Sequence, residues 1–246
     1  MQSSYCRGSR LAVAFAFTVM VCSATGLANA DPGVTAHPGM EIRQGNTVCM
    51  IGLVEPRLRV ALTSGQCGGG KSLVTDRDGK PVGSVVLGRR ATAEDAAAES
   101  VMPPVEYEVI ALAPEVAASD LLPNGLHLQS TPGLRAEPGL PVCQYRSSGG
   151  QKCGSVGSVS NGRFSMEGIA VDSRDFGGPV YALTGDNDAV IVGLFEGMLR
   201  SAPQMESWQA VMQQVTIDGS AQGHQQVAGV HVISSYRPLT GALAAA

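Results

Sequence analysis

The segment Arg174-Asp175-Phe176-Gly177-Gly178-Pro179-Val180-Tyr181 places two glycines and a proline directly before an apolar run. Glycine adopts backbone dihedrals that other residues avoid and lets two chains approach closely. The segment therefore predicts a tight turn that leads into a strand at 179–183. Many hydrolases present a nucleophile at a strained turn of this kind. The position before the two glycines holds Phe176, and a phenyl ring cannot attack a carbonyl.

The composition outside this segment predicts an all-β fold. The chain has 246 residues, of which 4% are aromatic, 31 are Gly and 14 are Pro, and β-branched residues gather in short runs between turn residues. Dense turn chemistry over 121–140 predicts a linker between two halves. The strand candidates are 47–53, 59–63, 81–88, 105–112, 141–145, 154–160, 163–171, 179–183, 189–195 and 230–233.

The region after the last long strand candidate has a helical pattern. Ser201-Ala202-Pro203-Gln204 resembles a capping box with Pro in the first turn, where its missing N–H costs little. Five apolar side chains then recur at helical spacing, which predicts a helix whose apolar face begins at Met205. Trp208 belongs to this face, and core packing explains it better than ligand stacking.

The first 30 residues have the pattern of a secretory signal peptide. Arg7 and Arg10 precede a short apolar run at 11–21, and Ala28-Asn29-Ala30 offers a cleavage site. The run is shorter than a membrane-spanning helix requires, so we expect an exported protein, extracellular or in the cell envelope, without stable membrane insertion. Removal of residues 1–30 takes away two basic residues and no acidic one, which leaves a net charge of −6. This charge argues against nucleic acid as a partner.

Four cysteines remain after residue 30. An even number in an exported protein favours disulfides over metal binding, although four cysteines permit three pairings. The local pairs Cys49–Cys67 and Cys143–Cys153 are preferred. The four histidines have no spacing that suggests a metal site, so we expect neither a metal nor a cofactor.

Four motifs in order resemble the chymotrypsin-like serine protease family, in particular its small secreted actinobacterial members. The segment at 174–179 resembles Gly-Asp-Ser-Gly-Gly-Pro, and Leu62-Thr63-Ser64-Gly65-Gln66-Cys67 resembles Leu-Thr-Ala-Gly-His-Cys. The strand at 105–110 resembles the segment that carries the triad Asp, and 143–153 resembles a short disulfide loop. The resemblance implies two antiparallel β-barrels and a C-terminal helix.

The same resemblance implies that the catalytic triad has been replaced. Gln66 stands at the base position, Glu106 at the orienting position and Phe176 at the nucleophile position. A glutamine amide cannot accept a proton from a nucleophile near neutral pH. The family's oxyanion-hole donors fall on Arg174 and Phe176. Since Arg174 stands where the family has Gly, we expect either backbone strain there or a flipped peptide and a lost oxyanion hole. Asp175 matches an acid that makes an internal ion pair.

These expectations divide the chain into a signal peptide (1–30), an N-terminal barrel (31–120), a linker (121–140), a C-terminal barrel with the helix (141–218) and a tail (219–246). The leading function is binding of a protein or peptide by an inactive protease homologue. One alternative is an enzyme that uses acids near the cleft, such as Glu196, Asp172 or Glu106. Two carboxylates in an open pocket would favour it, whereas a pocket filled by Phe176 would favour binding. Another alternative is a purely structural envelope protein, which would have no recessed apolar patch.

Overall fold

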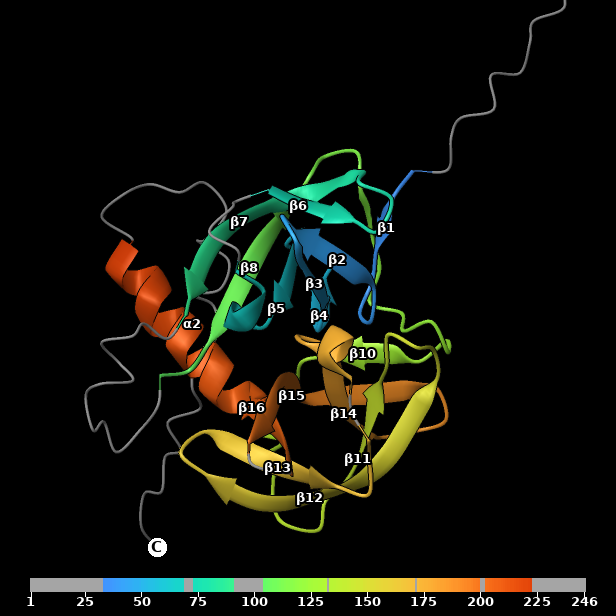
Figure 1. Ribbon diagram of the computed structural model, residues 1–246, viewed down its shortest axis with the longest axis vertical. Helices are drawn as coiled ribbons and strands as arrows, with labels where there is room; N and C mark the ends of the chain where they lie inside the picture. The colour runs from blue at the N-terminus through green and yellow to red at the C-terminus, as the bar shows by residue number, and fades with distance from the viewer. Residues whose placement is uncertain are drawn as a thin grey trace, which may run out of the picture. The chain divides into compact units, whose positions relative to one another are not determined.

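The computed structural model describes residues 33–68, 73–90, 104–131, 133–170, 172–199 and 202–222. All of them belong to the second of the two compact units into which the chain divides, Gly33–Ala246. The expected signal peptide and the strand candidate at 230–233 lie outside the described residues. Two seven-stranded sheets, a short parallel pair and one long helix form the described fold, which is all-β apart from that helix and two short 3₁₀ turns (Figure 1).

The first sheet contains β2–β8 and curls into a half-barrel. Its strands pair antiparallel in the order β3-β2-β6-β7-β8-β5-β4. At the β3 edge, the Met50 amide donates to the Phe176 carbonyl at 2.7 Å instead of to a strand. The strands are β2 (Glu41–Gln44), β3 (Thr47–Met50), β4 (Leu53–Glu55), β5 (Val60–Thr63), β6 (Leu73–Asp76), β7 (Pro81–Arg89) and β8 (Tyr107–Leu112).

The second sheet closes into a six-stranded barrel. Its order is β10-β15-β14-β11-β12-β13-β16, and an additional pairing between β15 and β16 joins the ends of the barrel. The short strand β10 pairs parallel to β15 from outside this ring. The strands are β10 (His127–Gln129), β11 (Pro141–Tyr145), β12 (Gln151–Ser160), β13 (Arg163–Glu167), β14 (Pro179–Leu183), β15 (Asp188–Leu199) and β16 (Ala202–Ser207).

The stretch 121–140, expected to link the two halves, contains the short strand β10. The strand β1 (Thr35–Ala36) pairs with β9 (Ala117–Ala118). The expected helix differs at its start. The helix α2 spans Trp208–Gln222, so the expected start near Met205 is wrong. Residues 202–207 instead pair with β13 and β15 as β16, and the Ser207 hydroxyl accepts from the Ala210 amide at 3.2 Å.

The helix packs against the seam of the two sheets. Trp208, Val211 and Val215 are buried in one apolar cluster with residues of both sheets, among them Tyr107 and Ile191. Trp208 is 6% exposed, so its expected role in the core is confirmed. Its indole donates to the Ser130 hydroxyl at 2.7 Å. In the part of the chain that is described, no helix combines the length and the apolar character needed to cross a membrane.

Candidate functional site

The turn before Gly177 and Gly178 is held by both sheets. Gly177 has φ of +78°, and a Cβ at this position would lie 2.0 Å from the Thr63 hydroxyl, so a side chain cannot be accommodated. The Gly177 amide donates to the Phe195 carbonyl at 2.8 Å. The Met50 amide donates to the Phe176 carbonyl from the other side. Together these two hydrogen bonds fix the backbone of Phe176 between the half-barrel and the barrel.

The Phe176 side chain packs at this seam. Its ring stacks on Phe195 with centroids 5.6 Å apart and planes 23° apart. A Cβ at Gly197 would lie 2.9 Å from Cε1 of Phe176, so the ring covers the Gly197 backbone closely. Phe176 is partly buried and contacts the apolar clusters of both sheets. The ring therefore joins the two halves of the core.

Gln66 and Glu106 form a hydrogen-bonded pair at the same seam. Gln66 lies in the 3₁₀ turn η1 (Gly65–Cys67). There the Ser64 hydroxyl accepts a hydrogen bond from the backbone amide of Gln66 at 3.2 Å. The Gln66 side-chain Nε2 donates to Oε2 of Glu106, which precedes β8 and is 2% exposed. The amide donates to the carboxylate and leaves its Oε1 as an acceptor, but it has no nitrogen that takes up a proton near neutral pH.

A pocket of about 330 Å³ opens between these groups. It brings Gln66 and Phe176 together, whereas Glu106 lies behind Gln66 and does not line it. Of the acids considered from sequence, only Glu196 reaches the pocket, so two carboxylates do not share it. The pocket also presents a recessed apolar wall. Its lining residues are Gln66, Arg163, Phe176, Glu196, Gly197, Met198 and Gln204.

A buried ion cluster lies beside the pocket, and sequence reasoning named only part of it. Nη2 of Arg163 donates to Oε1 of Glu196 at 2.6 Å and to Oε1 of Glu206 at 2.8 Å. The Glu106 amide also donates to Oε1 of Glu206, at 3.2 Å, which links β8 to the barrel. Glu206 is fully buried, and its Oε2 has no hydrogen-bond partner within the described residues.

Burial raises the pKa of Glu196 to about 8, with further contributions from the Glu206 carboxylate and from a hydrogen bond with the Glu106 side chain; Arg163 acts in the opposite direction. Burial also raises the pKa of Glu206. Burial and the neighbouring Glu206 carboxylate thus favour the protonated form of Glu196. The sequence gives no signal for the contact between Arg163 and Glu206, because Glu206 falls within the helical pattern and only strand pairing brings it beside Arg163.

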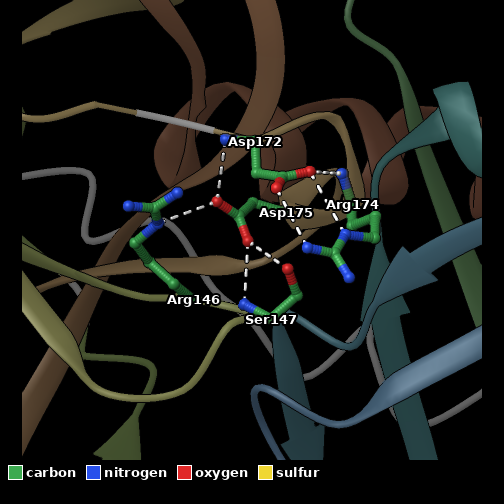
Figure 2. A network of polar contacts seen from close by, with 5 residues as sticks. All are labelled: Arg146, Ser147, Asp172, Arg174 and Asp175. Atoms are coloured by element: carbon green, nitrogen blue, oxygen red, sulfur yellow. Dashed lines mark hydrogen bonds and ion pairs between the residues drawn. The ribbon is translucent and has the colours of Figure 1, made fainter.

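The loop that precedes Phe176 is stabilised by its own acids (Figure 2). Asp175 is fully buried and accepts from Arg146 Nε at 3.1 Å, from the Ser147 amide at 2.8 Å and from the Ser147 hydroxyl at 2.7 Å. The expected internal ion pair of Asp175 is thus confirmed. Asp172 caps the 3₁₀ turn η2 (Ser173–Asp175), and its Oδ1 accepts from the Arg174 amide at 2.9 Å.

Backbone strain at Arg174 was one of the two outcomes expected from the sequence, and it does not occur. Among the described residues, the non-glycine positions with positive φ are Arg59 and Asn161, and Arg174 is not one of them. The turn instead directs its amide to the Asp172 carboxylate. The Arg174 amide is therefore already bound within the chain.

The cysteines form the disulfides Cys49–Cys67 and Cys143–Cys153, with Cα atoms 5.8 Å and 3.9 Å apart. His37 contacts the Pro38 carbonyl and His127 contacts Asp120 at 3.2 Å, while His224 and His231 lie outside the described residues. No group of three or more His, Cys, Asp or Glu side chains suited to a metal ion occurs in the part of the chain that the structure describes.

Solved structures identify the fold. A glutamic-acid-specific serine protease is similar with a TM-score of 0.54 and 16% identity, over 72% of this chain and 96% of its own. Chymotrypsin from Cellulomonas bogoriensis is similar with a TM-score of 0.53 and 17% identity, over 73% and 95%. The inactivated protease paralogue S-I1 from the scabies mite has a TM-score of 0.50 and 13% identity, over 77% and 96%. The architecture is therefore the chymotrypsin-like serine protease fold.

Sequence comparison places the chain more narrowly. It is 42% identical over 209 residues to the Mycobacterium tuberculosis proteins Rv1815 (strain H37Rv) and MT1863 (strain CDC 1551), both of which bear the name uncharacterized protein. The alignments cover 83% of this chain and 94% of each relative. The chain belongs to the family of these mycobacterial proteins. No protein-family model matches it.

Proposed function

We propose that the protein is an exported, catalytically inactive serine-protease homologue that binds a protein or peptide at the pocket between its two halves. The observation that carries the proposal is the Phe176 ring, which stacks on Phe195 and covers Gly197 at the position of the family's nucleophile. Gln66 supports the same conclusion, because it stands where the family has an imidazole and its side-chain amide is hydrogen-bonded to Glu106. The Arg174 amide, bound by Asp172, supports the loss of the oxyanion hole.

Export is supported by the signal-peptide pattern of residues 1–30 and by the two disulfides, which persist in oxidising compartments. The alternative of an acid–base enzyme is disfavoured by the pocket lining, because among the described residues Glu196 is the only carboxyl group that lines the pocket. A purely structural role is disfavoured by the recessed wall of Phe176, Gly197 and Met198. A binding pocket with mixed apolar and polar walls is the arrangement that small ligands and peptide side chains use.

The proposal is tested by capture with matched surface variants. Met198 at the pocket is 55% exposed and Leu183, at the far end of the β14–β15 pair, is 52% exposed. The purified protein, Met198→Asp and Leu183→Asp are immobilised and incubated with culture and cell-envelope material. We expect a partner that is retained by the unchanged protein and by Leu183→Asp but lost by Met198→Asp. Equal retention by both variants, or no retained partner, would contradict binding at the pocket.

A further inference from the structure

The two disulfides differ in their access to solvent. In the buried disulfide, Cys49 and Cys67 are 1% and 0% exposed and belong to the apolar cluster of the half-barrel. In the exposed disulfide, Cys143 is buried but Cys153, on β12, is exposed. Attack by an external thiolate depends on access to the attacked sulfur. Cys153 is therefore the cysteine that an external thiolate can reach.

A hydrogen-bond donor lies against both sulfurs of the exposed disulfide. Nε2 of Gln151 donates to Sγ of Cys143 and to Sγ of Cys153, each at 3.0 Å. Oε1 of the same side chain accepts from Nδ2 of Asn124 at 2.8 Å, which orients the amide. When Cys153 is attacked, the electron pair of the broken bond leaves on Cys143. A hydrogen bond to an ionised acceptor is stronger than one to a neutral acceptor, so Gln151 stabilises the departing thiolate.

The strands around the exposed disulfide stay paired without it. Cys143 lies directly opposite Cys153 in the antiparallel pairing of β11 with β12, and the register continues on both sides, at 141–142 and 144–145. Reduction thus leaves two thiols that face each other across a hairpin that is still hydrogen-bonded. The disulfide forms again by the reverse exchange with an oxidised dithiol.

The loop closed by the exposed disulfide holds the segment that leads to Phe176. Arg146 and Ser147 lie on this loop, and both point toward the fully buried Asp175, to which they donate three hydrogen bonds (Figure 2). Asp175 directly precedes Phe176 in the sequence. The disulfide is the covalent closure of the loop that carries these donors. Its redox state therefore acts on the residues that position the turn at Phe176.

We propose that Cys143–Cys153 is a thiol–disulfide exchange site that takes a dithiol, and that its redox state controls the mobility of the turn at Phe176. One thiolate of the dithiol bonds to Sγ of Cys153, and the bond between the two cysteine sulfurs breaks with its electron pair on Cys143, which takes up a proton. The second thiolate then attacks the reagent's own sulfur in the mixed disulfide, and Cys153 leaves and takes up a proton. The protein disulfide is reduced to two thiols, and the dithiol is oxidised to a disulfide.

The exchange site is tested by reduction of the folded protein with dithiothreitol in the absence of denaturant. Alkylation with iodoacetamide at successive times, followed by peptide mass spectrometry, measures the reduction of each disulfide separately. We expect the exposed disulfide to be reduced at least about tenfold faster than the buried one, because the buried one reacts only after local opening. Circular dichroism of the product should retain the signal of the folded protein.

The role of Gln151 is tested by Gln151→Met, which keeps the length of the side chain and removes the donor. We expect reduction of the exposed disulfide to slow by about tenfold, as the loss of one hydrogen bond to a charged group predicts. The matched control is Gln129→Met, a change at an exposed glutamine of β10, which should leave the rate unchanged.

Hydrogen exchange tests the effect on the turn. The Ser147 amide donates to the Asp175 carboxylate and the Gly178 amide donates to the Asp175 carbonyl. We expect both amides to exchange faster in the reduced protein, and likewise in the double variant Cys143→Ala with Cys153→Ala. Amides of β2 and β3 should exchange as before. If the double variant does not fold, the reduced protein carries the comparison.

Three results would overturn the inference. Equal rates for the two disulfides, or faster reduction of the buried one, would exclude a selective exchange site. Loss of the folded signal on reduction would show that the hairpin does not hold without its disulfide. Unchanged hydrogen exchange at Ser147 and Gly178 would exclude control of the turn at Phe176. The inference does not depend on what the pocket binds, so the capture experiment judges the proposed function by itself.

Discussion

Phe176 contributes to stability through contacts that a serine at the same position could not make. Its ring contacts Phe195 and the backbone of Gly197, and it touches the apolar clusters of both sheets. Full burial of a phenylalanine side chain stabilises a protein by about 1.5–3 kcal/mol, and the partial burial of Phe176 places it at the lower end. The residue thus stabilises the seam at which the proposed pocket opens.

We expect Phe176→Ser to lower the melting temperature and Phe176→Leu to lower it less, because leucine keeps much of the apolar contact. For a protein of this size, each kcal/mol corresponds to about 2–4 °C. Thermal unfolding followed by circular dichroism measures both variants. An unchanged midpoint for Phe176→Ser would rule out the packing role and leave Phe176 as an exposed contact for a partner.

Under the proposed assignment of Gln66 to the base position and Phe176 to the nucleophile position, restoring His and Ser there should not produce a hydrolase. In the double variant Phe176→Ser with Gln66→His, the Arg174 amide still donates to Asp172, so the proposed oxyanion donor remains occupied. Loss of one such donor costs about 10²–10³-fold in rate. We expect no hydrolysis of peptide or ester substrates above the level of the unchanged protein. Turnover that appears in this variant and is absent from Phe176→Ser alone would show that the loop still provides an oxyanion hole.

At the scale of elements, Arg163 ties strands together that are distant in sequence. It extends from β13 to acids on β15 and β16, and it donates to the Pro104 carbonyl at 3.1 Å on the chain that leads into β8. The Glu106 amide completes the connection by donating to Glu206. The cluster therefore joins the half-barrel to the barrel through buried charges, where removal of one partner is costly.

Arg163→Met should destabilise the protein by roughly 3 kcal/mol, because it leaves the buried Glu206 carboxylate without its counter-charge. Urea denaturation measures the change. Arg43→Met is the matched control, since Arg43 is 46% exposed and pairs with Glu41 on the surface, where such pairs contribute about 0–1 kcal/mol. Comparable small effects for the two variants would mean that the cluster does not hold the two halves together.

At the scale of the whole molecule, the raised pKa values of buried glutamates contribute to how stability depends on pH. Burial raises the pKa of Glu196 to about 8 and that of Glu108 to about 7, whereas an unfolded glutamate titrates near 4.5. Between these values the folded state holds protons that the unfolded state has released. The stabilising contribution is therefore complete below about pH 4.5 and is lost as pH rises through about 7 and then about 8.

We expect the free energy of unfolding to fall by a few kcal/mol between about pH 5 and pH 9, since one pKa unit corresponds to about 1.4 kcal/mol. Urea denaturation across this range measures the slope. Glu196→Gln and Glu108→Gln should each flatten it, because an amide keeps the uncharged form at every pH. Stability that increases over the range in the unchanged protein would contradict the raised pKa values.

The sequence predicted features that local chemistry determines and missed those that distant pairing determines. Gly177 indicated its turn correctly because only glycine tolerates the close approach to Thr63. The expected helix start is wrong because Pro203 suits both the first turn of a helix and the beginning of a strand. Arg163 and Glu206 come together only through the pairing of β13 with β16, to which no local signal in the sequence corresponds.

The protein is proposed to bind a partner at its pocket without an activated serine. The most direct test exposes the purified protein to a fluorophosphonate, which modifies activated serine hydroxyls, followed by intact mass measurement with an active serine protease in parallel. We expect no increase in the mass of this protein and complete labelling of the protease. A stoichiometric adduct on any serine, above all on Ser173 in the η2 turn, would contradict the account.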